Sequence, residues 1–153
     1  SIWTDMLKYN AKKKRLSSAN ATSSIVLNFD NATLDTNYKT IGEFLPMVSG
    51  NVSMQFEFEK NWGNASVSRL DDTVIQIFND TDNAVVYESS DTSELKSHTI
   101  EIELGKKYLI RSKIAIADGD TIIRNVYVYP TSITFSYSIQ EKPEHILTKV
   151  VTE

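Results

Sequence analysis

The chain has 153 residues, of which 16 are Lys or Arg, 20 are Asp or Glu and none is Cys. This length suits one domain, and the missing cysteines exclude disulfides, thiolate metal sites and a cysteine nucleophile. A formal charge of −4 argues against a general affinity for nucleic acid, and no segment has the roughly 20 consecutive apolar residues that a membrane-spanning helix needs.

The first 24 residues differ from the rest of the chain. Trp3, Met6 and Leu7 recur at helical spacing, and the cationic residues 12–15 follow them, which suits the negative end of a helix dipole. We therefore predict a short N-terminal helix and a polar arm over residues 1–24, with no signal peptide. Because a short helix must pack on something, its apolar stripe is a candidate docking element, either for the rest of its own chain or for another subunit.

From residue 25 onward, apolar residues occupy every second position. The clearest segment places Val52, Met54, Phe56 and Phe58 on one face and polar side chains on the other, as in a half-buried strand. Segments rich in β-branched and aromatic residues are expected to be strands as well. They cover residues 25–29, 51–60, 72–79, 84–89, 97–104, 107–116, 121–129 and 132–139.

Polar turn residues separate these segments at 79–83, around Gly105, around Gly119 and at Pro130. Strands at intervals of 8 to 12 residues with such turns indicate an antiparallel sandwich or barrel. No helical pattern lies between the strands, which argues against a parallel α/β sheet. The sequence therefore predicts an all-β, jelly-roll-like antiparallel sandwich of about eight strands over residues 25–153.

Few residues offer catalytic chemistry. The two histidines, His98 and His145, have no Ser or Asp at a recognisable spacing, and His98 shares the parity of Ile100 and Ile102. We expect His98 to begin a strand at the rim of the core. The paired acids of the predicted loops suit turns better than a calcium loop, which needs ligands at fixed positions. We therefore predict no enzyme activity, no metal and no cofactor.

The most suggestive loop surrounds Trp62, which lies between Asn61 and Asn64. An indole in a polar loop either stacks on a sugar or enters a partner's pocket, or else folds back over the edge of the core. Asp80 and Asp82 lie in a second predicted loop. These five residues are the candidate binding positions.

A characteristic order of strand and turn residues runs through residues 50–137. Its positions are Gly50, Val52, Met54, Phe56, Ile75, Ile77, Phe78, Gly105, Arg124, Asn125, Val126, Val128 and Tyr129. In this order of residues, the segment resembles the β-sandwich domains of tail-tip, baseplate and receptor-binding proteins of long-tailed bacteriophages of Gram-positive hosts. The loop 80–84 lacks the usual Asn-Gly, and residues 115–121 form an insert relative to the pattern.

This resemblance implies a non-enzymatic structural or host-attachment module of the virion, assembled in the host cytoplasm. Its expected partners are further copies of itself or other tail proteins, with host cell-wall saccharide as a further candidate, and neither nucleic acid nor membrane. The alternative is a carbohydrate-binding module of a secreted bacterial protein, in which Trp62 and tyrosine side chains stack on the sugar.

Overall fold

A computed structural model of the chain describes residues 22–30, 34–61, 72–115, 127–138 and 146–151. The described residues form nine strands and one 3₁₀ turn. These are β1 (Thr22–Asn28), β2 (Lys39–Pro46), β3 (Gly50–Asn61), β4 (Asp72–Asn79), β5 (Ala84–Ser89), η1 (Glu94–Lys96), β6 (His98–Ile102), β7 (Tyr108–Ala115), β8 (Tyr127–Ser138) and β9 (Ile146–Val150). The predicted N-terminal helix, with Trp3, Met6 and Leu7, lies outside the described residues.

The strands pair as a nested hairpin. β1 pairs with β8, β2 with β7, β3 with β6 and β4 with β5, all antiparallel. Further pairing of β8 with β3 and of β7 with β4 rolls this hairpin into two sheets, ordered β1-β8-β3-β6 and β5-β4-β7-β2-β9. This is the double-sheet jelly-roll arrangement, so the predicted all-β sandwich is confirmed.

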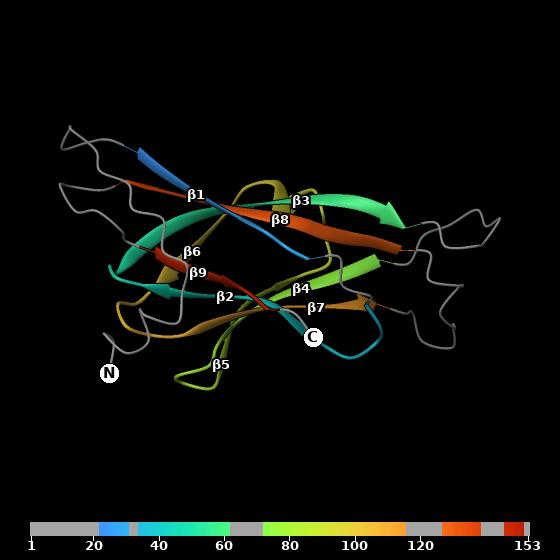
Figure 1. Cartoon of the computed structure of the whole chain (residues 1–153), viewed down its shortest axis with the longest axis horizontal. Helices are drawn as coiled ribbons and strands as arrows, with labels where there is room; N and C mark the ends of the chain where they lie inside the picture. Colours follow the sequence, from blue (N-terminus) through green and yellow to red (C-terminus); the bar gives the residue numbers. More distant parts are fainter. Residues whose placement is uncertain (1–21, 31–33, 62–71, 116–126, 139–145, 152–153) are drawn as a thin grey trace.

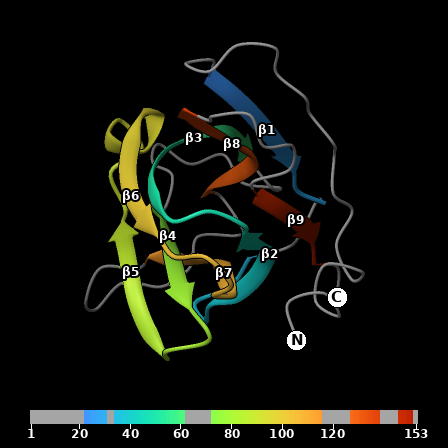
Figure 2. The same ribbon diagram turned by 90° about the vertical axis from the view of Figure 1, so that its left-hand side faces the viewer.

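The two sheets form two packed layers. β1, β3 and β8 lie above β2, β4 and β7 in Figure 1. Seen along the sandwich, β6 lies beside β5 and β1 beside β9, so the layers approach each other at both edges (Figure 2). β9 pairs with β2 and thereby extends the five-stranded sheet beyond the eight strands of the jelly roll.

The core lies between the layers, and the inward residues of the predicted strands form part of it. Val52, Met54 and Phe56 of β3 are buried in it. At its centre, the Phe44 ring lies 4.9 Å from that of Tyr108 and 4.8 Å from that of Phe135, measured between ring centroids. Close aromatic packing of this kind adds to the free energy gained by burying the rings, which fixes the two sheets against each other.

The prediction of separate strands on either side of Pro130 is wrong, because β8 runs through this residue as one strand. Its register against β3 shifts there: Glu57 pairs with Ser132 and Phe58 with Pro130, so Thr131 is an extra residue in a β-bulge. Proline has no N–H to donate to the ladder, and a bulge is one of the few places in a sheet where this is tolerated. The bulge also exchanges the two faces of β8, which interrupts the alternation in the sequence.

Two strands, β2 and β9, were not predicted. β2 contains Gly42 at a second register shift, where an added Cβ would lie 3.0 Å from a Leu27 methyl and 3.1 Å from the Phe29 ring. Glycine therefore permits close approach of the strand to the core, at the cost of the apolar pattern by which strands are recognised. Counting β2 and β9, and joining the two halves of β8, turns the eight expected strands into nine.

Candidate functional site

The predicted binding residues Asp80 and Asp82 lie in the turn between β4 and β5. The Asn79 side chain closes this turn by accepting from the backbone N–H of Asp82 at 2.9 Å and donating to its carboxylate at 3.1 Å. Asn83 completes the turn with a φ of 55°, a left-handed conformation that asparagine tolerates. Asp80 and Asp82 are therefore residues of a tight turn, as the sequence predicts.

Lysines of the neighbouring β6–β7 turn neutralise both acids. Lys106 Nζ donates to Asp82 at 2.9 Å, and Lys107 Nζ lies 3.7 Å from Asp80. The hydrogen bond from Lys106 holds the pKa of Asp82 below its ordinary value, and the pKa of Lys106 is raised by the same bond. Because each carboxylate already faces an ammonium group, this pair serves to tie two turns together.

His98 begins β6 at the rim of the core, as the sequence predicts. Its ring lies 4.1 Å from the Tyr87 ring of β5, measured between centroids, and its Nδ1 lies 3.4 Å from a Glu94 carboxylate oxygen. The other Glu94 oxygen accepts from the Ser89 hydroxyl at 2.9 Å. Burial raises the pKa of Tyr87. The histidine therefore joins the adjacent edges of the two sheets.

A different kind of surface lies along β3. β6 pairs with β3 only from Gly50 to Met54, so within the described part of the chain no strand covers that side of residues 55–61. Glu57 directs its carbonyl toward β8, where the Thr131 hydroxyl donates to it at 3.3 Å. Since alternate residues of a strand address opposite neighbours, Phe56 and Phe58 direct their backbone N–H and C=O groups toward the uncovered side.

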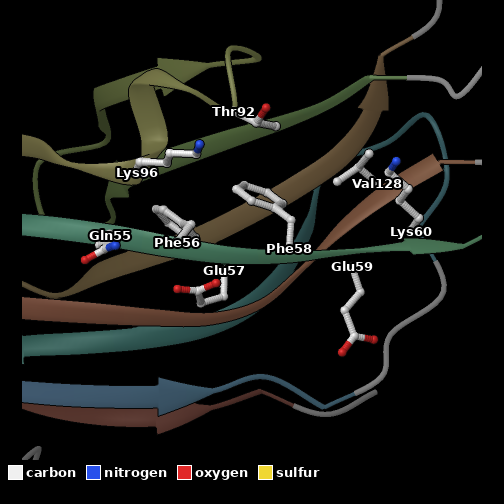
Figure 3. A pocket seen from close by; sticks show the side chains of 9 residues that line it. All are labelled: Gln55, Phe56, Glu57, Phe58, Glu59, Lys60, Thr92, Lys96 and Val128. Carbon is white, nitrogen blue, oxygen red and sulfur yellow. The ribbon is translucent and has the colours of Figure 1, made fainter.

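A cavity of about 380 Å³ lies beside this uncovered edge. We call it the β3 groove. Phe56, Phe58 and Val128 form its apolar wall, and Thr92 and Lys96 face them from the β5–β6 connection (Figure 3). The side chains of Gln55, Glu57 and Glu59 point away from the groove, so these residues line it through their backbone.

The far wall of the groove is held in place by its own hydrogen bonds. Leu95 of η1 is fully buried in the core. Asp91 accepts from the Ser93 hydroxyl at 2.6 Å and from the Ser93 N–H at 2.9 Å, and the first of these bonds chiefly lowers the pKa of Asp91. The loop that carries Thr92 and Lys96 is therefore fixed beside β3 before any ligand arrives.

The groove carries a cation at its rim. Lys96 is exposed, and none of the ion pairs found among the described residues involves it. The nearest acid along the chain, Glu94, is engaged by Ser89 and His98. The groove can therefore bind an apolar side chain of a ligand at its apolar wall, hydrogen-bonding groups of the ligand at the β3 backbone, and a carboxylate of the ligand at Lys96.

The other predicted site residues remain predictions. Trp62 and Asn64 lie outside the described residues, and Asn61 ends β3 with a side chain that is not described. The β3 groove itself was not predicted. The only signal for it is that the alternating pattern of residues 51–60 is longer than that of its partner, residues 97–104.

In the described ranges, no three His, Asp or Glu side chains come together as a metal ion would require. Nor does the described part of the chain include a helix of the length and apolar character needed to cross a membrane. Among the described residues that line the groove, Lys60 and Lys96 are the cations, and no acidic side chain points into it. It therefore suits a peptide or another organic ligand better than a metal.

No protein-family description matches the chain, and no curated protein does. Among solved structures, the chain is similar to a chain in the acidic stable capsid structure of Helicobacter pylori bacteriophage KHP30. The sequence identity is 10%, the TM-score is 0.31, and the match covers 92% of this chain and 100% of that one. Likeness at this level carries no argument about function, which has to come from the described side chains.

Proposed function

We propose that the chain is a non-enzymatic structural or host-attachment module of a bacteriophage virion, in the tail region, and acts through contacts with other proteins. It would be assembled in the host cytoplasm and reside in the virion. The observation that carries this proposal is that the eight strands from β1 through β8 pair as in a jelly roll, an architecture shared by viral capsid and lectin domains. The resemblance of residues 50–137 to phage tail domains supports it independently.

A fold alone leaves function open, so the use of the polar side chains matters as well. Asp80 and Asp82 tie two turns together, and His98 joins two sheet edges. These contacts make a rigid body whose loops and edges keep their positions. Rigid presentation of a surface is what a subunit of a symmetric assembly requires, because many weak contacts then act together.

Light scattering on the full chain tests the assembly role. We expect an oligomer, or a complex with another tail protein, that is lost when residues 1–16 are deleted, since Trp3, Met6 and Leu7 are the candidate docking residues. A monomer whose behaviour is unchanged by the deletion would contradict the role of the N-terminal segment. Flanking genes for tape-measure or baseplate proteins would support placement in the tail, and flanking metabolic genes would oppose it.

Attachment to host cell-wall saccharide is tested separately with a glycan array, on which Trp62→Ala is compared with the unmodified chain. We expect the substitution to abolish any glycan binding, because it removes the indole that would stack on the sugar. Binding that survives the substitution, or no binding at all, would restrict the proposed function to contacts between proteins.

A further inference from the structure

We propose that the uncovered edge of β3 accepts an extended segment of another polypeptide as an added strand, in which apolar residues alternate with basic ones. The apolar residues of that segment would enter the β3 groove, and its basic residues would lie on the outer face of the sheet. This inference rests on the proposed function, because it names the chemistry of one partner of the module. Adding a strand to a sheet edge is a recurrent way to recognise peptides, since backbone hydrogen bonds supply affinity and side-chain pockets supply specificity.

The backbone of β3 offers the hydrogen bonds. In its first half, β6 occupies the position beside β3, with Met54 opposite His98. Just beyond this pair the chain of β6 departs into η1, while β3 continues to Asn61. An added strand would continue the line of β6 and pair with the N–H and C=O groups that Phe56 and Phe58 direct to that side.

The side of the added strand that faces the groove is expected to be apolar. Residues opposite Phe56 and Phe58 would point to the same side of the sheet as these rings and enter the cavity of about 380 Å³, which favours large apolar groups. Lys60 and Lys96 also line this cavity (Figure 3). Because like charges close together repel each other, the lysines disfavour a basic side chain of the partner inside the groove.

The outer face beside the same edge carries negative charge. The side chains of Glu57 and Glu59 are exposed and point away from the groove (Figure 3). Neither takes part in the ion pairs found within the described ranges. Their partners on β8, Ser132 and Tyr129, bring no positive charge, although the Tyr129 hydroxyl donates to Glu59 at 2.8 Å.

These glutamates specify the second half of the pattern. A residue of the added strand opposite Glu57 or Glu59 would lie on the same outer face as the carboxylate. Lysine or arginine at that position would form a cross-strand pair of opposite charge, which stabilises a sheet, whereas an acidic residue would be repelled. The charges on both faces therefore favour the same orientation of the strand, with its apolar residues inward and its basic residues outward.

A second copy of β3 lacks this chemistry. Symmetric antiparallel pairing of two open halves, centred on Phe58, places Glu57 of each copy opposite Glu59 of the other. Like charges directly opposite each other destabilise a sheet. The glutamates that attract a basic strand thus act against self-pairing, and the added strand comes from a different segment.

Two peptides, each acetylated and amidated, test the chemistry. β6 belongs to the sequence SHTIEIEL, in which the isoleucines face the core and Glu101 faces outward. TIEIEL repeats part of this segment, and TIKIKL has lysines in place of its glutamates. When its second isoleucine lies opposite Phe58, an antiparallel TIKIKL places its lysines opposite Glu57 and Glu59. Titration of either peptide into the ¹⁵N-labelled full chain, followed by NMR, reports both the affinity and the residues affected.

We expect TIKIKL to shift the amide signals of Phe56 and Phe58 and to slow hydrogen exchange at Phe58. TIEIEL should bind about tenfold more weakly, because two exposed attractive pairs become repulsive. Glu57→Lys should weaken TIKIKL by about threefold and strengthen TIEIEL by a similar factor. Glu101→Lys is the matched control: it makes the same charge change on the same face of the sheet, but opposite Asn51 in the paired half, so both affinities should be nearly unchanged.

Phe58→Ala should remove the apolar contact and weaken both peptides. Since this variant changes a half-buried residue, its fold is checked from the unaffected signals of β4 and β7. Shifts confined to other surfaces, no binding at millimolar peptide, or an affinity for TIEIEL that equals or exceeds that for TIKIKL would each overturn the proposal. So would an effect of Glu101→Lys as large as that of Glu57→Lys.

Hydrogen exchange in the absence of peptide tests whether the edge is already occupied. We expect the Phe58 amide to exchange fast in the free chain. Protection of this amide in a dimer would overturn the proposal in favour of a second copy, and protection in a monomer would overturn it in favour of a segment of the same chain.

The proposed function fails on other results. If neither peptide binds while light scattering still shows assembly with tail proteins, only the groove inference is lost. If TIKIKL binds as expected while the chain neither assembles nor comes from a phage gene cluster, the groove inference stands and the virion role is lost.

Discussion

The two halves of β3 have the same side-chain pattern but different surroundings. From Gly50 to Met54 the strand pairs with β6, and from Ser53 onward it also pairs with β8. From Gln55 to Asn61 it pairs with β8 alone. In both halves alternate side chains face inward, yet Met54 is fully buried whereas Phe58 is half-buried. Burial of one strand thus depends on how far its neighbours extend.

This difference separates a structural half from a half that is available for contacts. The paired half begins at Gly50, near three turns that bind one another. The Leu104 N–H donates to the Ser49 hydroxyl at 2.8 Å, and the Asp80 N–H donates to the Lys107 carbonyl at 2.8 Å. The open half ends beside the β3 groove. An open sheet edge is usually blunted or covered, because it invites another strand.

The largest expected effect comes from truncating one inward-facing residue in each half. Met54→Ala should lower the free energy of unfolding by about 2–5 kcal/mol, as for buried residues that leave a cavity. Phe58→Ala should cost only about 1–2 kcal/mol, although phenylalanine is larger, because its ring is already partly hydrated. Urea denaturation followed by fluorescence measures both values. Equal costs would show that the open half is as well packed as the paired half.

Amide hydrogen exchange sharpens the comparison without any substitution. Within the open half, the Glu57 amide faces β8 and the Phe58 amide faces the uncovered side, so Phe58 should exchange at least about tenfold faster than Glu57. In the paired half, Val52 and Ser53 should both be protected, since the Val52 amide faces β6 and the Ser53 amide faces β8. Protection of Phe58 equal to that of Val52 would mean that its amide is already bonded.

The repeating pattern of the strands is the part of the fold that the sequence predicts well. β4 and β5 match the expected residues 72–79 and 84–89, because both are rich in β-branched and aromatic residues and polar turns mark their ends. Elsewhere two irregularities of the strands make the prediction wrong. The bulge at Thr131 exchanges the faces of β8, and Gly42 removes an inward side chain from β2.

The candidate site is less predictable, for a physical reason. A groove at an open edge depends on which strands lie side by side and on where the shorter one stops. Neither is encoded near Phe58 itself, since β6 starts forty residues later along the chain. The acids at 80 and 82 attract attention in the sequence, but the lysines that neutralise them come from another turn. Binding by Trp62 and docking by Trp3 remain predictions.

A smaller effect is expected at the turn-rich end of the molecule. Asn83 has a left-handed backbone conformation, with φ of 55°. Asn83→Ala should lower the free energy of unfolding by about 1 kcal/mol, because an added Cβ disfavours this conformation and alanine lacks the compensating side-chain hydrogen bonding. Asn83→Gly should be nearly neutral. The two variants are compared by their denaturation midpoints, with unchanged m-values as the control.

The smallest effect concerns the pair formed by Asp82 and Lys106, which tests whether the turns of this end are held by charge. The pKa of Asp82 lies below its ordinary value of 3.8 when the chain is folded. The folded carboxylate thus stays ionised at a pH where the unfolded one takes up a proton, and its stabilisation is present above the unfolded pKa. That stabilisation is lost as the pH falls from about 4 through the folded pKa.

Thermal unfolding between about pH 6 and pH 2.5 measures this loss, and Asp82→Asn should make the melting temperature fall less steeply over the acid part of that range. The change should be small and should shrink at high salt, because the pair is exposed. Lys106→Met should flatten the curve in the same way, and the double variant should add nothing further. If the two single effects simply add, the residues act separately, and the turns are joined by their backbone bonds rather than by this ion pair.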